Sequence, residues 1–163
     1  MVDFQSISIT LAALSFVVAA IYYAMNLREV SRNRRITLTT TLLQPFMTEE
    51  GNRLLIDLYG IEWSDMEDYR RKYDHRVNPE SYAKRAAVWN RCNSIGGLYR
   101  QGLLDLETLY AGTGGIIEVM WRKYKPVIEM YRVTDMDRSA YEHWEYLADE
   151  MIKLRQPGIE IET

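Results

Sequence analysis

The longest apolar run lies near the N-terminus. From Ile7 to Met25 no side chain is charged, and only three hydroxyl side chains interrupt the run before its first tyrosine. A helix of about 20 residues rises about 30 Å, the thickness of a bilayer core. A soluble core helix would have a polar face, and a secretory signal would begin with basic residues, whereas only Asp3 precedes this run. The pattern predicts a retained transmembrane helix, with a cleaved signal and a buried helix as alternatives.

The residues after the apolar run predict how it would be oriented. Tyr22 and Tyr23 stand where an interfacial aromatic belt is expected. Four arginines follow within eight residues, against a single acid: Arg28, Arg32, Arg34 and Arg35. The positive-inside rule predicts a cytoplasmic body in the cell membrane and an N-terminus outside. Two roles stay open for the arginines: they attract an anionic leaflet, by ~1 kcal/mol each, or they only set topology.

Small side chains form a stripe along the predicted span. Ser8, Ala12, Ser15 and Ala19 recur at spacings of 4, 3 and 4, so they share one helix face. Small residues let a second helix approach closely. The stripe therefore predicts a helix-packing surface, although alanine is also common in membrane spans generally.

Helical periodicity continues after the span, and no strand-like alternation precedes the last few residues. We predict an all-α protein, with a single N-terminal transmembrane helix and a compact cytoplasmic bundle of about five helices. The expected parts are a tail and span at 1–27, a basic juxtamembrane helix or linker at 28–47, the bundle at 48–156, and a tail at 157–163. We expect the first helix to continue to Pro45.

Local signals place the helices of the bundle. Thr48 is the expected cap of a helix that Gly60 ends, and Ser64 with Glu67 reads as a capping box. Asn78-Pro79-Glu80 opens a helix that Gly102 ends, and Asp105 caps a short one. Ser139 is the expected start of the last helix.

The expected inward faces are Leu54, Leu55, Leu58 and Tyr59; Val88, Trp89, Cys92, Ile95, Gly96 and Tyr99; Ile117, Trp121, Tyr124, Ile128 and Tyr131; and Trp144, Leu147, Met151 and Leu154. Pro126 predicts a kink.

The charge distribution disfavours nucleic acid as a partner. The formal net charge is −3, yet the collar of residues 28–35 is basic, so the rest of the chain is acidic. Phosphate binding along a nucleic acid requires a sustained basic face. One cysteine, Cys92, excludes an intrachain disulfide and fits a reducing compartment.

Residues with catalytic potential are few. His75 lies in a charged connector and is expected to be solvated, and neither Glu142 nor Glu145 shares a helix face with His143. The segment 135–142 lacks the glycine and the final acid of a calcium loop, and AGTGG at 111–115 has no following lysine. Cys92 lies on an apolar stripe, and Asn90 and Asn93 are expected to be buried and to bond backbone, for example at the Pro126 kink. We therefore expect no catalytic residue, no cofactor and no metal.

The segment from Asn78 to Arg132 carries a family resemblance. NPESYAKRAAVWNRCNSIGGLYRQGLLDLETLY is followed by GGIIEVMWRKYKPVIEMYR, with a W-x-K-Y-x-P-V-I pattern. With a single N-terminal span, this resembles the DUF4760-like group, an uncharacterised family of small membrane-anchored helical proteins. The resemblance implies a helical fold and a single anchor, and it implies no catalytic residues.

Together these features predict a non-catalytic, membrane-anchored binding module, an accessory or regulatory subunit of a larger membrane complex. Its expected partners are the lipid bilayer and other membrane subunits or a second copy. The stripe, the collar, the acidic helix Asp65–Asp74 and the IEIE tail would supply contacts. Two alternatives stay open. One is a sensor or enzyme with a bundle pocket lined by Trp89, Asn93, Trp121 and Tyr124, and the other is a homo-oligomeric structural protein.

Overall fold

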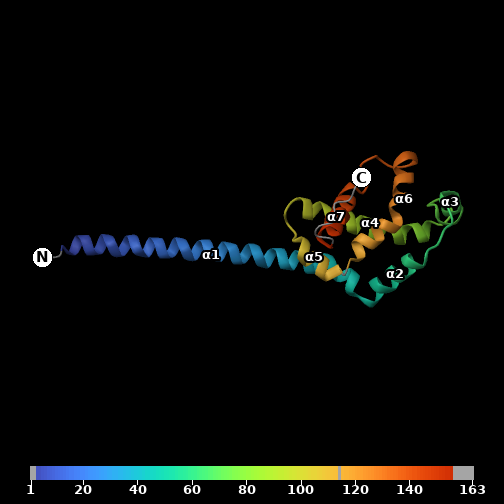
Figure 1. Cartoon of the computed structure of the whole chain (residues 1–163). Coiled ribbons are helices and arrows are strands. Elements are labelled where there is room, and N and C mark those ends of the chain that lie inside the picture. The colour runs from blue at the N-terminus through green and yellow to red at the C-terminus, as the bar shows by residue number, and fades with distance from the viewer. Residues whose placement is uncertain (1–2, 114, 156–163) are drawn as a thin grey trace. The chain divides into compact units, whose positions relative to one another are not determined.

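The fold is entirely helical over the residues described by this computed structural model, 3–113 and 115–155. Seven helices and no strand lie in these ranges (Figure 1). The predicted all-α class, with one long apolar N-terminal helix and a helical bundle, is confirmed. The predicted tail at 157–163, with its IEIE segment, lies outside the described residues.

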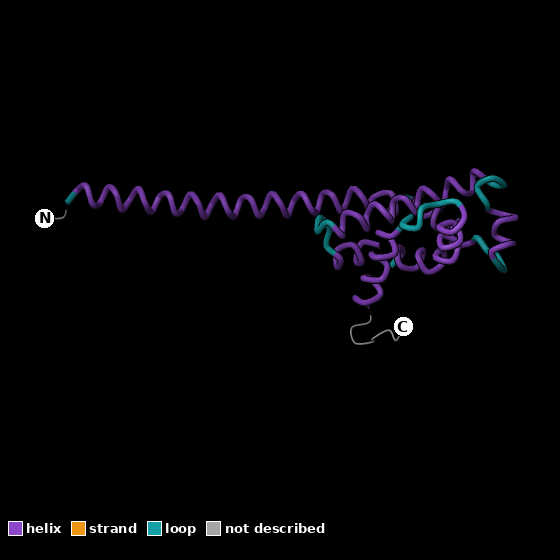
Figure 2. Tube along the Cα trace, turned by 90° about the horizontal axis from the view of Figure 1, so that it is seen from above, coloured by secondary structure: helices purple, strands orange, loops and turns teal. Residues whose placement is uncertain are grey.

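Helix α1 (Phe4–Met47) is one uninterrupted helix (Figure 2). It contains no glycine, and its only proline, Pro45, falls in the last turn. The helix extends two residues beyond the predicted end, although Pro45 has no N–H to donate to the Thr41 carbonyl. The chain divides into two units, residues 1–38 and residues 39–163, and the division falls within this helix.

The last turns of α1 belong to the second unit. Thr39, Leu43 and Phe46 are buried, at the i, i+4, i+7 spacing of one helix face. The guanidinium of Arg91 lies 5.3 Å from the centre of the Phe46 ring. This end of the helix is therefore part of the bundle core.

Two short helices follow. Helix α2 (Glu49–Gly60) begins as predicted, since Thr48 Oγ1 accepts the Gly51 N–H at 3.0 Å. Helix α3 (Met66–Tyr73) begins one residue later than the Ser64–Glu67 pattern predicts. Its cap is Asp65, whose carboxylate accepts the Asp68 N–H at 2.8 Å. The Asp68 carboxylate in turn accepts the Ser64 N–H at 3.2 Å. The predicted box on Ser64 and Glu67 is therefore replaced by a related pair of bonds, in which Asp65 is the cap and the returning bond comes from the residue before it.

The other helices form the centre of the bundle. Helix α4 (Pro79–Arg100) is capped by Asn78. Gly102 follows it at φ +72°, in the left-handed conformation that glycine adopts easily. Helix α5 (Leu106–Thr113) is capped by Asp105, whose carboxylate accepts the Thr108 N–H at 2.8 Å. Helix α6 (Ile116–Thr134) continues through Pro126, where the kink stays a prediction.

The start of the last helix, α7 (Glu142–Arg155), corrects the sequence prediction. Ser139 does not open it. The Asp137 carboxylate accepts the Ser139 N–H at 2.8 Å, which forms a turn, and Tyr141 has φ +62°, outside the helical region. The helix therefore begins three residues later than predicted.

The core is rich in aromatic rings. Helix α7 packs against α4 and α6, and the predicted seam Ile117, Trp121, Tyr124, Ile128 and Tyr131 is buried throughout. The Trp144 indole N–H donates to the Ile117 carbonyl at 3.0 Å, and the Tyr124 hydroxyl donates to the Leu58 carbonyl at 2.8 Å. Four predicted inward residues are not fully buried: Leu54, Tyr59, Tyr99 and Leu154.

Candidate functional site

The predicted packing stripe lies on an uncovered face of α1. Ala12, Ser15 and Ala19 are exposed, as is Ser8. Ser15 Oγ donates to the Leu11 carbonyl at 2.8 Å, so its hydroxyl is satisfied within the helix. Ser15 and Ala19 line a shallow, largely apolar hollow with Leu14, Val18 and Tyr22. The hollow is a groove between neighbouring side chains of one helix, and its lining is mostly apolar.

The predicted interface residues are also exposed. Tyr22 and Tyr23 are 72% and 64% exposed, and the four collar arginines project from the same helix. Within the described part of α1, no apolar side chain from Phe4 to Ile36 is buried by the protein. This part of α1 thus presents its apolar length and its basic collar outward.

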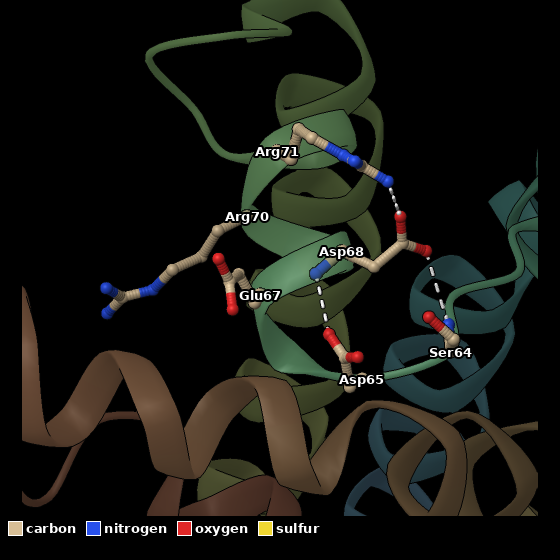
Figure 3. A pocket seen from close by; sticks show the side chains of 6 residues that line it. All are labelled: Ser64, Asp65, Glu67, Asp68, Arg70 and Arg71. Carbon is tan, nitrogen blue, oxygen red and sulfur yellow. Dashed lines mark hydrogen bonds and ion pairs between the residues drawn. The ribbon is translucent and has the colours of Figure 1, made fainter.

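A second candidate site is a polar hollow at the start of α3 (Figure 3). It is lined by Ser64, Asp65, Glu67, Asp68, Arg70 and Arg71. In Figure 3 the side chains of Arg70 and Glu67 extend away from the Asp68 carboxylate, towards the other side of the helix. The hollow therefore has a paired acid on one side and further charged side chains on the other.

Asp68 is held as an anion by its neighbours. Lys72 Nζ lies 2.7 Å from its carboxylate and an Arg71 guanidinium nitrogen lies 2.6 Å from it. These two bonds lower the pKa of Asp68 to about 2, against a smaller opposing effect of burial. Such a group holds no proton to donate near neutral pH, and its charge is already balanced.

The structure also reveals a buried guanidinium that sequence reasoning missed. Arg85 of α4 is fully buried, and no carboxylate pairs with it within the described part of the chain. Its guanidinium carbon lies 5.3 Å from the centre of the Tyr69 ring. The same carbon lies 5.8 Å from the centres of the Tyr73 and Tyr82 rings. One nitrogen donates to Ser81 Oγ at 2.7 Å, and another donates to the Tyr73 carbonyl.

This arrangement explains why α3 is attached to α4. The Tyr73 carbonyl is at the C-terminus of α3, where the helix dipole favours a cation. The surrounding π faces provide a further electrostatic compensation for the buried charge. Arg85 therefore has a structural role in joining two helices.

A buried carboxylate joins two other helices. Glu118, in the first turn of α6, has a side chain that is 1% exposed. One of its oxygens lies 2.8 Å from an Arg122 nitrogen and 3.5 Å from an Arg155 nitrogen of α7. The two arginines balance its charge, so this pair of contacts is also structural.

The histidines and the cysteine occupy packing positions. The His75 side chain is 35% exposed, 3.3 Å from the Asp74 carboxylate and against the rings of Tyr82 and Tyr131, so it is partly rather than fully solvated. His143 packs beside Gly97. Cys92 is fully buried, and burial raises the pKa of its thiol to about 12.

The prediction for the two asparagines holds for one of them. Asn93 is partly buried and its Oδ1 accepts the backbone N–H of Trp144 in α7 at 3.1 Å, so it bonds backbone as expected, although not at Pro126, whereas Asn90 is exposed. The other side chains suggested for a ligand pocket are core residues: Trp89 packs on Tyr124 at 5.4 Å, and Trp121 packs on Trp144 at 5.2 Å. Among residues 3–113 and 115–155, no group of three or more His, Cys, Asp or Glu side chains is arranged to hold a metal ion.

These observations define an all-helical protein in which one described helix is long and apolar enough to cross a membrane. The model of a family described as a domain of unknown function, DUF4760, matches residues 8–151, and the chain belongs to this family. No curated protein and no solved structure matches the chain. The resemblance noted in the sequence is thus confirmed at the level of the family.

Proposed function

We propose that the protein is a non-catalytic, membrane-anchored helical binding module, an accessory or regulatory subunit of a larger membrane complex. Helix α1 spans the cell membrane through residues 7–27, and the bundle lies in the cytoplasm. The stripe on α1 contacts a helix of a partner subunit. The bundle offers further contacts on its polar surface, including the hollow at α3.

The observation that carries the proposal is the exposed apolar surface of α1. Ten large apolar side chains other than tyrosine, between Ile7 and Leu27, are 47 to 76% exposed. Full burial of such a side chain contributes about 1.5–3 kcal/mol. Their partial exposure to water would therefore cost roughly 10–20 kcal/mol in total. A bilayer core, matched in thickness to this length of helix, removes that cost.

The orientation rests on the collar. Four arginines follow the apolar segment within eight residues, whereas Asp3 is the only charged side chain before it. The positive-inside rule then favours a cytoplasmic bundle. The reduced Cys92 is compatible with that compartment.

The proposed docking face has a matched control on the same helix. Ala12 and Ala19 lie on the stripe, whereas Ala13 and Ala20 lie about 100° around the helix from them. Replacing Ala12 and Ala19 with leucine adds bulk where close approach is needed, and the same change at Ala13 and Ala20 adds equal bulk elsewhere. Only the first pair should weaken association.

The experiment combines membrane fractionation with mild detergent extraction. The full chain should stay with membranes in alkaline carbonate, and its extracted form should exceed the mass of a monomer. Release by carbonate would refute the span. A complex that contains only copies of this chain would instead favour the homo-oligomeric alternative, for which the stripe is equally suitable.

A further inference from the structure

The collar arginines are unevenly distributed around α1. Arg28, Arg32 and Arg35 follow the i, i+4, i+7 pattern, and at about 100° per residue they lie within about 60° of one another. Arg34 lies about 100° from Arg35, and Glu29 lies about 100° from Arg28 on the opposite side. All five side chains are exposed. The helix therefore has one arginine face, defined by residues 28, 32 and 35.

A narrow uncharged strip lies opposite the arginine face of the same helix. Asn26, Val30, Asn33 and Thr37 each lie about 140° or more from Arg28, on the line that continues the stripe of Ala12 and Ala19. One side of the helix thus carries three arginines below the proposed span. The fourth, Arg34, lies about 40° from Val30, at the edge of the uncharged strip. Arginines spread evenly around the helix would only set its topology. Arginines gathered on one side also favour the orientation in which that side faces the lipid headgroups.

Arg28 lies at the level of the polar layer of a bilayer, and Arg32 and Arg35 lie at and just beyond its outer edge. Headgroups occupy roughly 5–7 Å on each side of the hydrocarbon core. Leu27 ends the apolar run, so Arg28 enters this layer at once, and Arg32 and Arg35 follow about 6 and 10 Å further along the axis. These distances stay within about one Debye length of the lipid phosphates at physiological salt.

We propose that Arg28, Arg32 and Arg35 form a binding surface for the phosphates of anionic lipid headgroups. The guanidinium groups pair with phosphate oxygens through forked, charge-assisted hydrogen bonds. Because the three cations share one side, the helix leans towards that side, which shortens the distance from Arg32 and Arg35 to the headgroups. The uncharged strip then turns away from the lipid surface and stays available to a helical partner. This inference rests on the proposed transmembrane placement of α1.

The test uses the full-length protein in liposomes of phosphatidylcholine and phosphatidylserine, with a trace of spin-labelled lipid of either kind. The fraction of each labelled lipid immobilised by the protein gives its relative association. We expect phosphatidylserine to be preferred, and we expect Arg32→Gln to lower that preference by about two- to fivefold, since one arginine contributes up to ~1 kcal/mol. Arg34→Gln, which removes the same charge from another side, should have a clearly smaller effect.

A charge-conserving exchange supplies the second comparison. The double variant Asn33→Arg with Arg32→Asn keeps the net charge and moves one arginine by about 100°, to about 140° from Arg28 and about 160° from Arg35. It should lose preference as Arg32→Gln does. Equal losses in Arg32→Gln and Arg34→Gln, or an unchanged preference in the exchange variant, would overturn the face-specific surface.

Two further results separate this inference from the proposed function. Protein that floats with the liposomes but immobilises both lipids equally would overturn the lipid surface and leave the anchor standing. Protein that does not float with liposomes after reconstitution would overturn the anchor, and the lipid surface with it.

Discussion

Gly96 lies where α4 and α7 approach most closely, and its replacement by alanine should destabilise the bundle strongly. A Cβ at this position would lie 2.1 Å from the His143 carbonyl oxygen and 2.5 Å from the His143 carbonyl carbon. Both atoms are backbone, and the adjacent Trp144 N–H is bonded to Asn93 of α4. Relief therefore requires the two helices to separate, with loss of contacts around Trp144.

The expected magnitude combines two opposing effects. Overpacking costs about 1–3 kcal/mol and sometimes more, and a backbone clash belongs at the upper end. Alanine recovers up to about 1 kcal/mol of helix propensity relative to glycine. We expect Gly96→Ala to lower the free energy of unfolding by about 2 kcal/mol, or roughly 6–12 °C in Tm for a bundle of this size.

The assay is unfolding of the full chain in detergent, followed by circular dichroism and tryptophan fluorescence. Gly60→Ala is the matched control, because a Cβ there meets no atom within 4 Å and the residue lies at the end of a helix. It should leave stability unchanged or raise it by up to about 1 kcal/mol. If Gly96→Ala proved as stable as Gly60→Ala, the described contact between α4 and α7 would be wrong.

Three other substitutions or treatments test the bundle. Arg85→Ala should cost about 3 kcal/mol in denaturant unfolding, because it removes buried volume and two hydrogen bonds. Arg85→Met loses the same hydrogen bonds but keeps the apolar stem, so it should cost less, and equal losses would argue against a contribution from packing of that stem. Cys92 should resist alkylation at pH 8 until the protein unfolds, because the pKa of its buried thiol is raised to about 12. The contribution of Cys92 to the free energy of unfolding should fall as pH rises above about 8.5, the pKa of the thiol in the unfolded chain. Rapid labelling of the native protein would contradict the burial of Cys92. Asp68→Asn should lower the free energy of unfolding at neutral pH. Because the pKa of Asp68 is lowered to about 2, this loss relative to wild type should disappear as pH falls from about 5 towards 2. A loss that persists undiminished at about pH 2 would exclude the ion pairs with Lys72 and Arg71 as its cause.

The start of a helix was predicted correctly where the sequence offered only one residue able to cap it. Thr48, Asn78-Pro79 and Asp105 each offered a single cap, and the structure uses all three. The seam from Ile117 to Tyr131 was predicted by its spacing and is fully buried. Such signals depend on neighbours within one or two turns, which are visible in the chain itself.

Errors arose where local patterns were degenerate. The spacing of a capping box fits Ser64 with Glu67, and it equally fits Asp65 with Asp68. The structure uses Asp65 as the cap, and Asp68 also pairs with Arg71 and Lys72. Ser139 resembled a helix start, but it is part of a turn that positions Tyr141 with positive φ.

The candidate site was only partly predictable for a different reason. The stripe and the collar follow from spacing on one helix, so their residues were found without tertiary structure. The burial of Arg85 depends on rings from α3 and α4 that meet only in the fold. A repeated tyrosine pattern, with Tyr69 and Tyr73 four residues apart and Tyr82 three before Arg85, was the one local indication of that cage.

The central claim is that α1 is both anchor and docking surface. The most direct test is mass analysis of the full chain extracted from its own membranes in a mild detergent, as wild type, as Ala12→Leu with Ala19→Leu, and as Ala13→Leu with Ala20→Leu. Wild type and the second pair should migrate in a complex with another membrane protein, and the first pair should be released as a 19.2 kDa monomer. A wild-type protein that is already monomeric, or a complex that both pairs leave intact, would contradict the claim.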